Sequence, residues 1–186
     1  MNELYICRHG ETSWSLSGRH TGKTDIHLTE NGKKQAALLG ERLKNIPFTA
    51  IFSSPRARAL ETCKMAGFAE PIIDSDLQEW DYGKYEGLTS IEIKKIDPHW
   101  QLFSQGAPGG ETPEQTSHRA DRMLQKLRAQ KGPVLIFCHG HFSRVLAVRW
   151  MGLAVKEAKS FFLSPASISI LGYEHEVPGI KLWNYS

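Results

Sequence analysis

The chain has 186 residues, which suits one compact domain with a sizeable core and leaves little room for two. Hydrophobic residues make up 40% of it and charged residues 23%, both ordinary for a globular protein in water. The formal net charge of +3 is too small to indicate a nucleic-acid or membrane binder. No apolar run reaches the roughly 18 residues of a membrane-spanning helix, and the N-terminus lacks the pattern of a secretory signal. We therefore expect one cytoplasmic domain over residues 1–186.

The cysteines do not suggest a structural cross-link. There are three of them, Cys7, Cys63 and Cys138, at wide spacings and without a CxxC pair. An odd number in this pattern speaks against a disulfide framework or a thiolate zinc site. Cys7 and Cys138 stand in apolar runs, so we expect both thiols to be buried in the core.

The first third of the chain alternates between strand and helix signals. Residues 4–7 form a short apolar run that stops at a polar loop, which predicts a buried strand. A helix follows, with Thr29 as its N-cap and Pro47 closing it. Residues 50–53 predict a second strand, and a second helix begins near Pro55, where a first helical turn tolerates proline.

The remainder continues this alternation. The clearest strand signal is residues 133–138, and residues 112–131 predict a long amphipathic helix with Pro113 at its first position. Further segments are a strand at 71–73, loops at 76–87 and 104–110, helices at 90–96 and 142–151, and strands at 166–173 and 180–183. Such alternation is typical of α/β proteins. We predict a single three-layer domain in which helices flank a mostly parallel central sheet.

Two predicted strands end in the same way. The first runs into Arg8-His9-Gly10, and the strand at 133–138 runs into His139-Gly140. Ligands of α/β sheets bind beyond the carboxyl ends of the strands, so the two histidines are expected to meet there. Glycine lets the backbone approach a ligand closely. The amide groups of the helix that follows His139 could also face an anion.

Arginines and acids complete the predicted site. The strand at 50–53 leads into a helix start that carries Arg56 and Arg58, and the guanidinium fork matches phosphate oxygens. Arg8, one of these two arginines and the two histidines would hold a phosphoryl group. The loop at 76–87 offers Glu79 and Asp81, either of which could protonate a leaving oxygen.

From residue 5 to about residue 150 the sequence resembles the histidine phosphatase superfamily, also called the phosphoglycerate mutase-like family. Six motifs match in the family's order. They are Arg-His-Gly-Glu-Thr at 8–12, the loop and helix start at 21–32, the second arginine motif at 53–62, the acid loop around Glu79, Gly-Gly-Glu-Thr at 109–112, and His-Gly at 139–140.

The resemblance implies a role for each matched residue. His9 attacks phosphorus and forms a phosphohistidine, as a histidine nucleophile is able to do. Arg8, Arg58 and His139 stabilise the transferring group. Glu79, in preference to Asp81, protonates the leaving alcohol and then activates the water that clears the intermediate. The family's reaction needs no metal and no cofactor, and its ligand would be a small phosphorylated metabolite.

Within the family, the motifs are most similar to a sugar-phosphate branch whose fungal member acts on sedoheptulose bisphosphate. The substrate is therefore expected to be a sugar phosphate or bisphosphate. The residues that the resemblance implies as substrate contacts are Ser15, Thr21, Gly22, Arg58, Glu79, Tyr82, Gly140 and Arg144.

Two other functions stay open as alternatives: a phosphoglycerate mutase and a non-catalytic module that binds a phosphorylated ligand. Ser15 departs from a mutase pattern, which has asparagine there. Mutases also carry an insertion after the acid loop with extra basic residues. Here the short stretch between Gly87 and Gly110 holds only Lys94 and Lys95 as cations, so a second phosphate site looks poorly supplied.

The other histidines and aromatic residues receive plainer interpretations. His139 and His141 have the spacing of a metal pair, but no carboxylate or thiolate stands at matching distance, so no metal is expected. We expect His141 at the edge of the substrate or behind it, and His20 to be an ordinary surface or packing residue. Trp14, Trp80, Tyr82 and Tyr85 are possible pocket residues.

Overall fold

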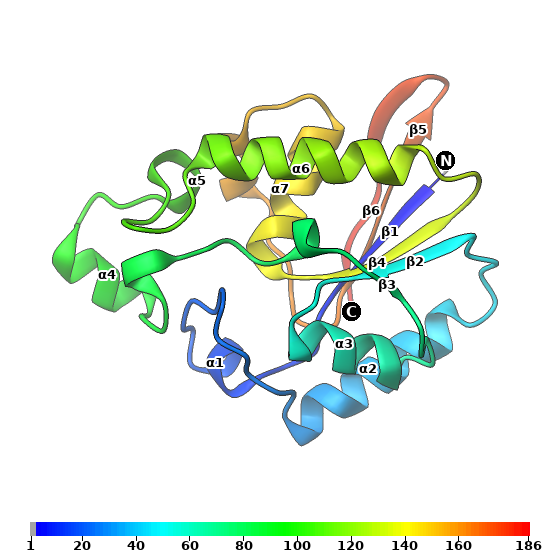
Figure 1. Cartoon of the computed structure of the whole chain (residues 1–186), viewed down its shortest axis with the longest axis horizontal. Coiled ribbons are helices and arrows are strands. Elements are labelled where there is room, and N and C mark those ends of the chain that lie inside the picture. The colour runs from blue at the N-terminus through cyan, green and yellow to red at the C-terminus, as the bar shows by residue number, and fades with distance from the viewer. Residues whose placement is uncertain (1–2) are drawn as a thin grey trace.

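A six-stranded sheet forms the centre of the computed structural model, which describes residues 3–186 (Figure 1). The order of its strands is β3-β2-β4-β1-β5-β6. The first four strands in that order run parallel, whereas β5 is antiparallel to β1 and β6 to β5, so the predicted mostly parallel sheet is confirmed. The strands are β1 (Glu3–Arg8), β2 (Ala50–Ser53), β3 (Ile72–Ile73), β4 (Val134–Cys138), β5 (Ile168–Glu174) and β6 (Val177–Tyr185).

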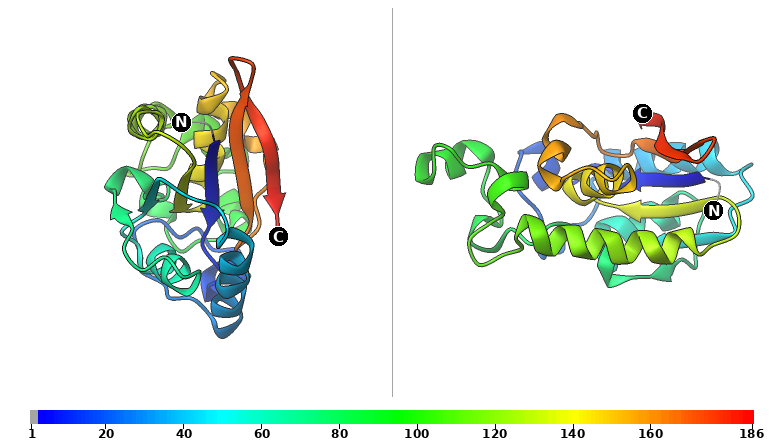
Figure 2. Two further views of the ribbon diagram at one scale, coloured as in Figure 1. Left: turned by 90° about the vertical axis from the view of Figure 1, so that its right-hand side faces the viewer. Right: turned by 90° about the horizontal axis from the view of Figure 1, so that it is seen from above.

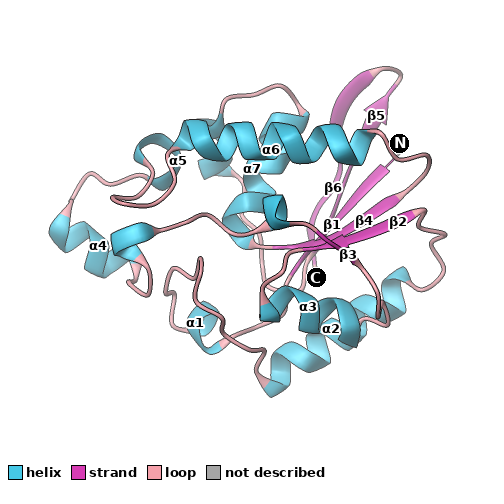
Figure 3. Ribbon diagram, in the orientation of Figure 1, coloured by secondary structure: helices cyan, strands magenta, loops and turns pink. Residues whose placement is uncertain are grey.

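The helices lie above and below the strands in Figure 3, which confirms the three-layer prediction. None of those within residues 3–186 has the length and apolar character needed to traverse a bilayer. Three short 3-10 turns supplement them, at Ser75–Leu77, Gly83–Tyr85 and Val155–Ser160. The helices are α1 (Ser13–Leu16), α2 (Glu30–Leu43), α3 (Ala57–Met65), α4 (Ser90–Ile96), α5 (Leu102–Gln105), α6 (Pro113–Arg128) and α7 (Gly140–Trp150).

Each face of the sheet has its own apolar core because successive strand residues point to opposite sides. In β1, Leu4 and Ile6 join the larger core beneath α6 and α7. Cys7, their neighbour, joins the second core, to which α2 and α3 contribute Leu39 and Cys63. The strand β4 alternates in the same way. Both strands are therefore buried on both faces, as their continuous apolar sequence predicted.

The boundaries differ from the predicted ones at several places. The helix α7 begins at Gly140 rather than at residue 142, and α1 was not predicted. The end of α5 occupies part of the loop predicted at 104–110. The hairpin of β5 and β6 lies at one edge of the sheet (Figure 2), and β6 is longer than predicted because it pairs with most of β5. Such pairing is a tertiary effect that overrides local propensity.

The loop after β1 packs closely against the helices α2 and α3. A Cβ atom on Gly32, in the first turn of α2, would lie 2.2 Å from the carbonyl oxygen of Glu11. A Cβ atom on Gly10 would lie 2.5 Å from the carbonyl oxygen of Gly32. The N–H of Gly10 also donates to Thr62 Oγ1 of α3, at 2.9 Å. This close crossing holds the loop that carries His9 in place.

We predict that Gly32→Ala destabilises the protein by about 1–3 kcal/mol, because its methyl group would meet backbone that cannot move aside cheaply. The matched control is Gly179→Ala, since a Cβ atom there meets nothing within 4 Å. Urea denaturation would measure both variants, and the control is expected to stay within about 0.5 kcal/mol of the wild type. Equal stability of the two variants would contradict a tight crossing.

Candidate active site

A cavity of about 230 Å³ opens where β1 and β4 end. The two strand ends meet there as predicted: the N–H of His9 donates to the carbonyl of Cys138 at 3.0 Å. The ring centroids of His9 and His139 are 5.3 Å apart. The predicted site residues that line this cavity are Arg8, His9, Ser15, Thr21, Glu79, Tyr82, Gly140 and Arg144.

His9 is held as a neutral ring with one free nitrogen. Its Nδ1 lies 2.8 Å from the carbonyl oxygen of Gly10. A carbonyl only accepts hydrogen bonds, so Nδ1 carries the proton and Nε2 keeps its lone pair. Burial lowers the pKa of His9 well below 6.5, and the positive charges of Arg58 and Arg8 lower it further. The ring is therefore unprotonated at neutral pH, with the lone pair of Nε2 available.

His139 has the opposite tautomer. The Nε–H of Arg58 donates to His139 Nδ1 at 3.1 Å, so the proton of the neutral ring is on Nε2. That nitrogen lies 2.8 Å from Ser54 Oγ, to which it donates. Burial lowers the pKa of His139 well below 6.5, and Arg58 adds to the effect. Both ring nitrogens of His139 are thus engaged within the protein, Nδ1 by Arg58 and Nε2 by Ser54.

Arg58 lies behind the cavity rather than in its wall, and its side chain is fully buried. Besides the bond to His139, its guanidinium donates to the carbonyls of Thr24, Thr21 and Gly22. These bonds use four of its five N–H groups and leave one on Nη1. Arg56 instead donates to Gln78, away from the histidines. Of the two arginines, Arg58 is the one that contacts the histidine pair.

The carboxylate of Glu79 sits at the N-terminus of α7. Its Oε1 accepts from the N–H groups of Trp80 and Phe142, at 2.9 and 2.8 Å, and its Oε2 from His141 at 2.9 Å. Amides at this helix end were predicted to face an anion, and that anion is the protein's own carboxylate. Asp81 is paired with Lys23 and does not line the cavity. The structure thus places Glu79, of the two acids, beside His9.

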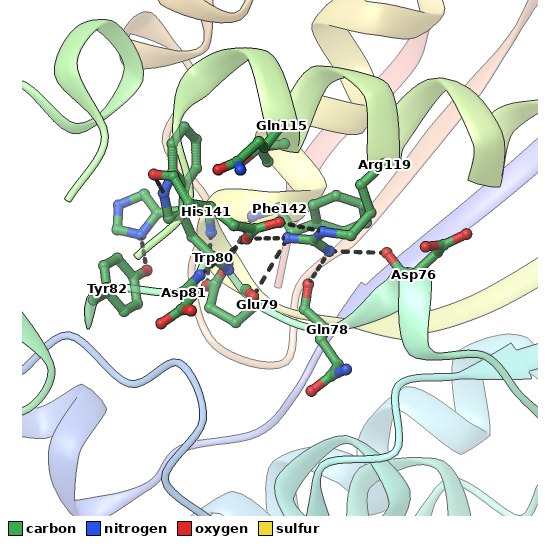
Figure 4. A network of polar contacts seen from close by, with 12 residues as sticks. Asp76, Gln78, Glu79, Trp80, Asp81, Tyr82, Gln115, Arg119, His141 and Phe142 are labelled. Atoms are coloured by element: carbon green, nitrogen blue, oxygen red, sulfur yellow. Dashed lines mark hydrogen bonds and ion pairs between the residues drawn. The ribbon is translucent and has the colours of Figure 1, made fainter. Parts of the chain in front are cut away.

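A buried arginine that sequence reasoning missed holds the Glu79 loop. Figure 4 shows Arg119 of α6 at the centre of this network. It donates to the carbonyls of Asp76 and Gln78 and forms two 2.7 Å bonds with the carboxylate of Glu111. Its guanidinium also lies 4.0 Å from the ring of Phe142. A single arginine on a long helix gives no local signal of such contacts.

Arg8 lines the cavity and carries a buried, unpaired donor. Its Nη1 donates to the carbonyl of Leu163, whereas its buried Nε has no partner among residues 3–186. A Cβ atom on Gly140 would lie 3.3 Å from the Cζ and Nε of Arg8. Gly140 therefore lines the cavity by making room for this guanidinium. An unpartnered buried N–H is costly and favours an anionic ligand at that point.

One wall of the cavity contains a histidine for which the sequence predicted no role. His20 lines the cavity, and its ring stacks on that of His141 with centroids 5.8 Å apart. His141 Nδ1 is 2.5 Å from the hydroxyl of Tyr82, and His20 Nδ1 donates to the carbonyl of Leu88. Burial lowers the pKa of both histidines. His20 was predicted to be a surface or packing residue; it packs against aromatic rings, and the fold places it in the cavity wall as well.

Four further predicted pocket residues lie elsewhere. Gly22 does not line this cavity: its N–H donates to Glu86, and its carbonyl accepts from Arg58. Trp80 and Tyr85 are buried in the larger core instead, and Trp14 is not among the residues that line the cavity. Gly22 therefore supports the buried Arg58, and its position does not favour a direct contact with the substrate.

A sequence profile of the histidine phosphatase superfamily (branch 1) matches residues 4–186. The chain belongs to this superfamily. An acid phosphatase of Mycobacterium tuberculosis is 42% identical, over 95% of this chain and 89% of its own length. A sedoheptulose 1,7-bisphosphatase of Saccharomyces cerevisiae is 31% identical, over 97% of this chain and 78% of its own length.

Solved structures agree with this assignment. The structure of an open reading frame from Mycobacterium tuberculosis has a TM-score of 0.96 and 40% identity, covering 100% of this chain and 98% of that one. Together with the family match, these relatives confirm the predicted enzyme class, a histidine-type phosphomonoesterase. The predicted phosphoglycerate mutase-like fold is confirmed as well.

The buried neutral histidines predict how stability depends on pH. His9, His139 and His141 have lowered pKa values in the folded state, so unfolding lets them take up protons below pH 6.5. Above pH 6.5 their contribution to the free energy of unfolding is complete. As the pH falls below that value, each ring lowers the free energy of unfolding by up to about 1.4 kcal/mol per pH unit.

Urea denaturation at a series of pH values would test this expectation. His141→Asn is expected to lower the number of protons taken up on unfolding by up to one, which makes the free energy of unfolding less dependent on pH. His99→Asn changes an exposed ring and should leave this dependence as in the wild type. The same slope in all three proteins would contradict the linkage.

Proposed function

We propose that the protein hydrolyses a small phosphomonoester, a sugar phosphate or bisphosphate, through a phosphohistidine at His9. The observation that carries the proposal is the free lone pair of His9 Nε2 in a cavity that is also lined by Arg8, whose buried Nε–H has no partner among residues 3–186. The names of two relatives, an acid phosphatase and a sedoheptulose bisphosphatase, support both the reaction and the sugar substrate.

In the first step, His9 Nε2 attacks phosphorus and the bond from phosphorus to the alcohol oxygen breaks. Arg8 stabilises the charge on the transferring group, as does the Nε2–H of His139 once it turns from Ser54 Oγ to a phosphoryl oxygen, and Arg58 orients His139. Glu79, after its carboxylate has taken up a proton, gives that proton to the departing oxygen. The products of this step are the alcohol, the phosphohistidine and the Glu79 carboxylate.

In the second step, water attacks the phosphohistidine. Glu79 takes a proton from this water, and the bond from phosphorus to Nε2 breaks. Inorganic phosphate leaves, and His9 returns to its neutral tautomer with the proton still on Nδ1. The three backbone N–H bonds hold Glu79 in one place for both proton transfers. The steps proposed here use side chains of the chain and water.

The first test is the phosphoenzyme. His9→Ala is expected to lower hydrolysis of p-nitrophenyl phosphate by at least about a thousandfold, because the nucleophile is lost. Wild-type protein quenched during turnover is expected to carry acid-labile, base-stable phosphate, which His9→Ala lacks. His99→Ala serves as the control for an exposed histidine. Unchanged activity of the His9 variant, or loss of wild-type activity with a chelator, would contradict the proposal.

The same preparation separates the phosphatase from the mutase alternative. The wild type is expected to release phosphate from sugar phosphates without efficient interconversion of 2- and 3-phosphoglycerate. Robust interconversion would favour the mutase instead. Absence of phosphate release from a broad substrate screen would favour a binding module.

The second test concerns Glu79 as the proton donor. Glu79→Gln is expected to lower kcat/KM for an alkyl phosphate by about 100-fold or more, because the poor leaving group needs the proton. A much smaller loss is expected for p-nitrophenyl phosphate, whose leaving group departs as an anion. Asp81→Asn is the matched control and should affect both substrates little. Equal losses on both substrates for Glu79→Gln would contradict the assigned role.

A further inference from the structure

A second cavity of about 200 Å³ adjoins the one beside His9. The two cavities share four lining residues, His20, Ser90, His141 and Arg144. We call the second cavity the side chamber. Its own lining includes Lys94 of α4 and Lys159 of the 3-10 turn after α7. A substrate with one end at His9 is able to extend into this chamber.

The side chamber is lined by cations and by no carboxylate. Lys94, Arg144 and Lys159 are its charged residues. Neither lysine forms an ion pair among residues 3–186, unlike Lys33 and Lys44, which pair with nearby glutamates. Three positive charges around one small space attract an anion, and the shared field favours a group with two negative charges.

Arg144 is built into this chamber rather than free at the surface. Its Nε and Nη2 donate to the carbonyls of Ala158 and Lys159, both at 2.9 Å, and its guanidinium lies 4.5 Å from the ring of Phe103. Burial lowers its pKa to about 10, so it remains charged at neutral pH. These contacts leave Nη1 without a partner among residues 3–186, and Arg144 lines both cavities.

The chamber changes the expectation that the sequence produced. Between Gly87 and Gly110 the only cations are Lys94 and Lys95, which suggested a poor supply for a second phosphate. The fold adds Arg144 and Lys159, which lie more than 40 residues after Lys95 in the chain. A second anion site is thus assembled from segments that sequence spacing does not connect.

We infer that the side chamber binds a second phosphoryl group, so that the preferred substrate is a bisphosphorylated metabolite whose other phosphate reacts at His9. The inference rests on the proposed function and narrows its substrate class. The neutral rings of His20 and His141 lie between the two anion sites, where they are able to hydrogen-bond hydroxyl groups of the substrate. The phosphate in the side chamber stays on the product.

A substrate series of graded length tests this inference on the wild type. The probes are bisphosphates of terminal alkanediols, monophosphates of alcohols with the same length, and phosphates with a terminal carboxylate. The ratio of kcat/KM for bisphosphate over monophosphate is expected to reach about tenfold at the best length, which corresponds to about 1.4 kcal/mol. The ratio is expected to fall as salt is added, because the two lysines are exposed.

Charge-matched double variants then locate the second site. Lys94→Gln with Lys159→Gln is expected to reduce the ratio about tenfold, toward one. Lys95→Gln with Lys156→Gln removes the same charge from the same two segments but outside the side chamber, and should leave the ratio as in the wild type.

The outcomes separate this inference from the proposed function. A wild-type ratio near one, or equal ratios in the two double variants, would overturn the side chamber as a phosphate site. An equal preference for the carboxylate probes would overturn the phosphoryl assignment. If the wild type hydrolyses none of the probes and no other phosphomonoester, the proposed function itself fails.

Discussion

The parallel pairing of β1 with β4 is the constraint on which the site depends. It sets Arg8 opposite Cys138, the last residues of their strands, so that the loops carrying His9 and His139 leave the sheet together. The backbone bond from His9 to Cys138 continues the pairing by one residue. A register shift of one residue would turn each side chain to the other face of the sheet. Both the cores and the histidine pair thus depend on one register.

The chemistry of the two histidines follows from what their Nδ1 atoms meet. A backbone carbonyl beside His9 requires a proton on that atom, whereas the Nε–H of Arg58 beside His139 excludes one. Two identical side chains therefore differ at Nε2, where His9 keeps a lone pair and His139 carries an N–H that donates to Ser54 Oγ. Burial keeps both rings neutral.

Buried arginines organise the site from behind. Arg58 and Arg119 each donate three of their N–H groups to backbone carbonyls, and these bonds hold the loops at 21–24 and 76–79. A buried charge is costly unless its donors are satisfied, which explains the many carbonyls around each guanidinium. The loops they hold contribute Thr21 and Glu79 to the cavity. Arg8 differs, since its buried Nε lacks a partner among residues 3–186.

The sequence by itself determined the α/β class, the strands that carry His9 and His139, and the family to which they belong. These depend on local signals: apolar runs, a capping threonine, a proline at a helix start, and short motifs read in order. It also identified Glu79 and Arg58 through their motifs.

Only the tertiary structure decided the tautomers, the location of Arg58 behind the cavity, the Arg119 network and the gathering of Lys94, Arg144 and Lys159 in the side chamber. It also showed that His20 lines the cavity and that Gly22 does not. The physical reason is distance along the chain. Hydrogen bonds and electrostatic interactions in the site join side chains that are dozens of residues apart in the sequence. The spacing of residues within one segment does not indicate which distant side chains folding brings together.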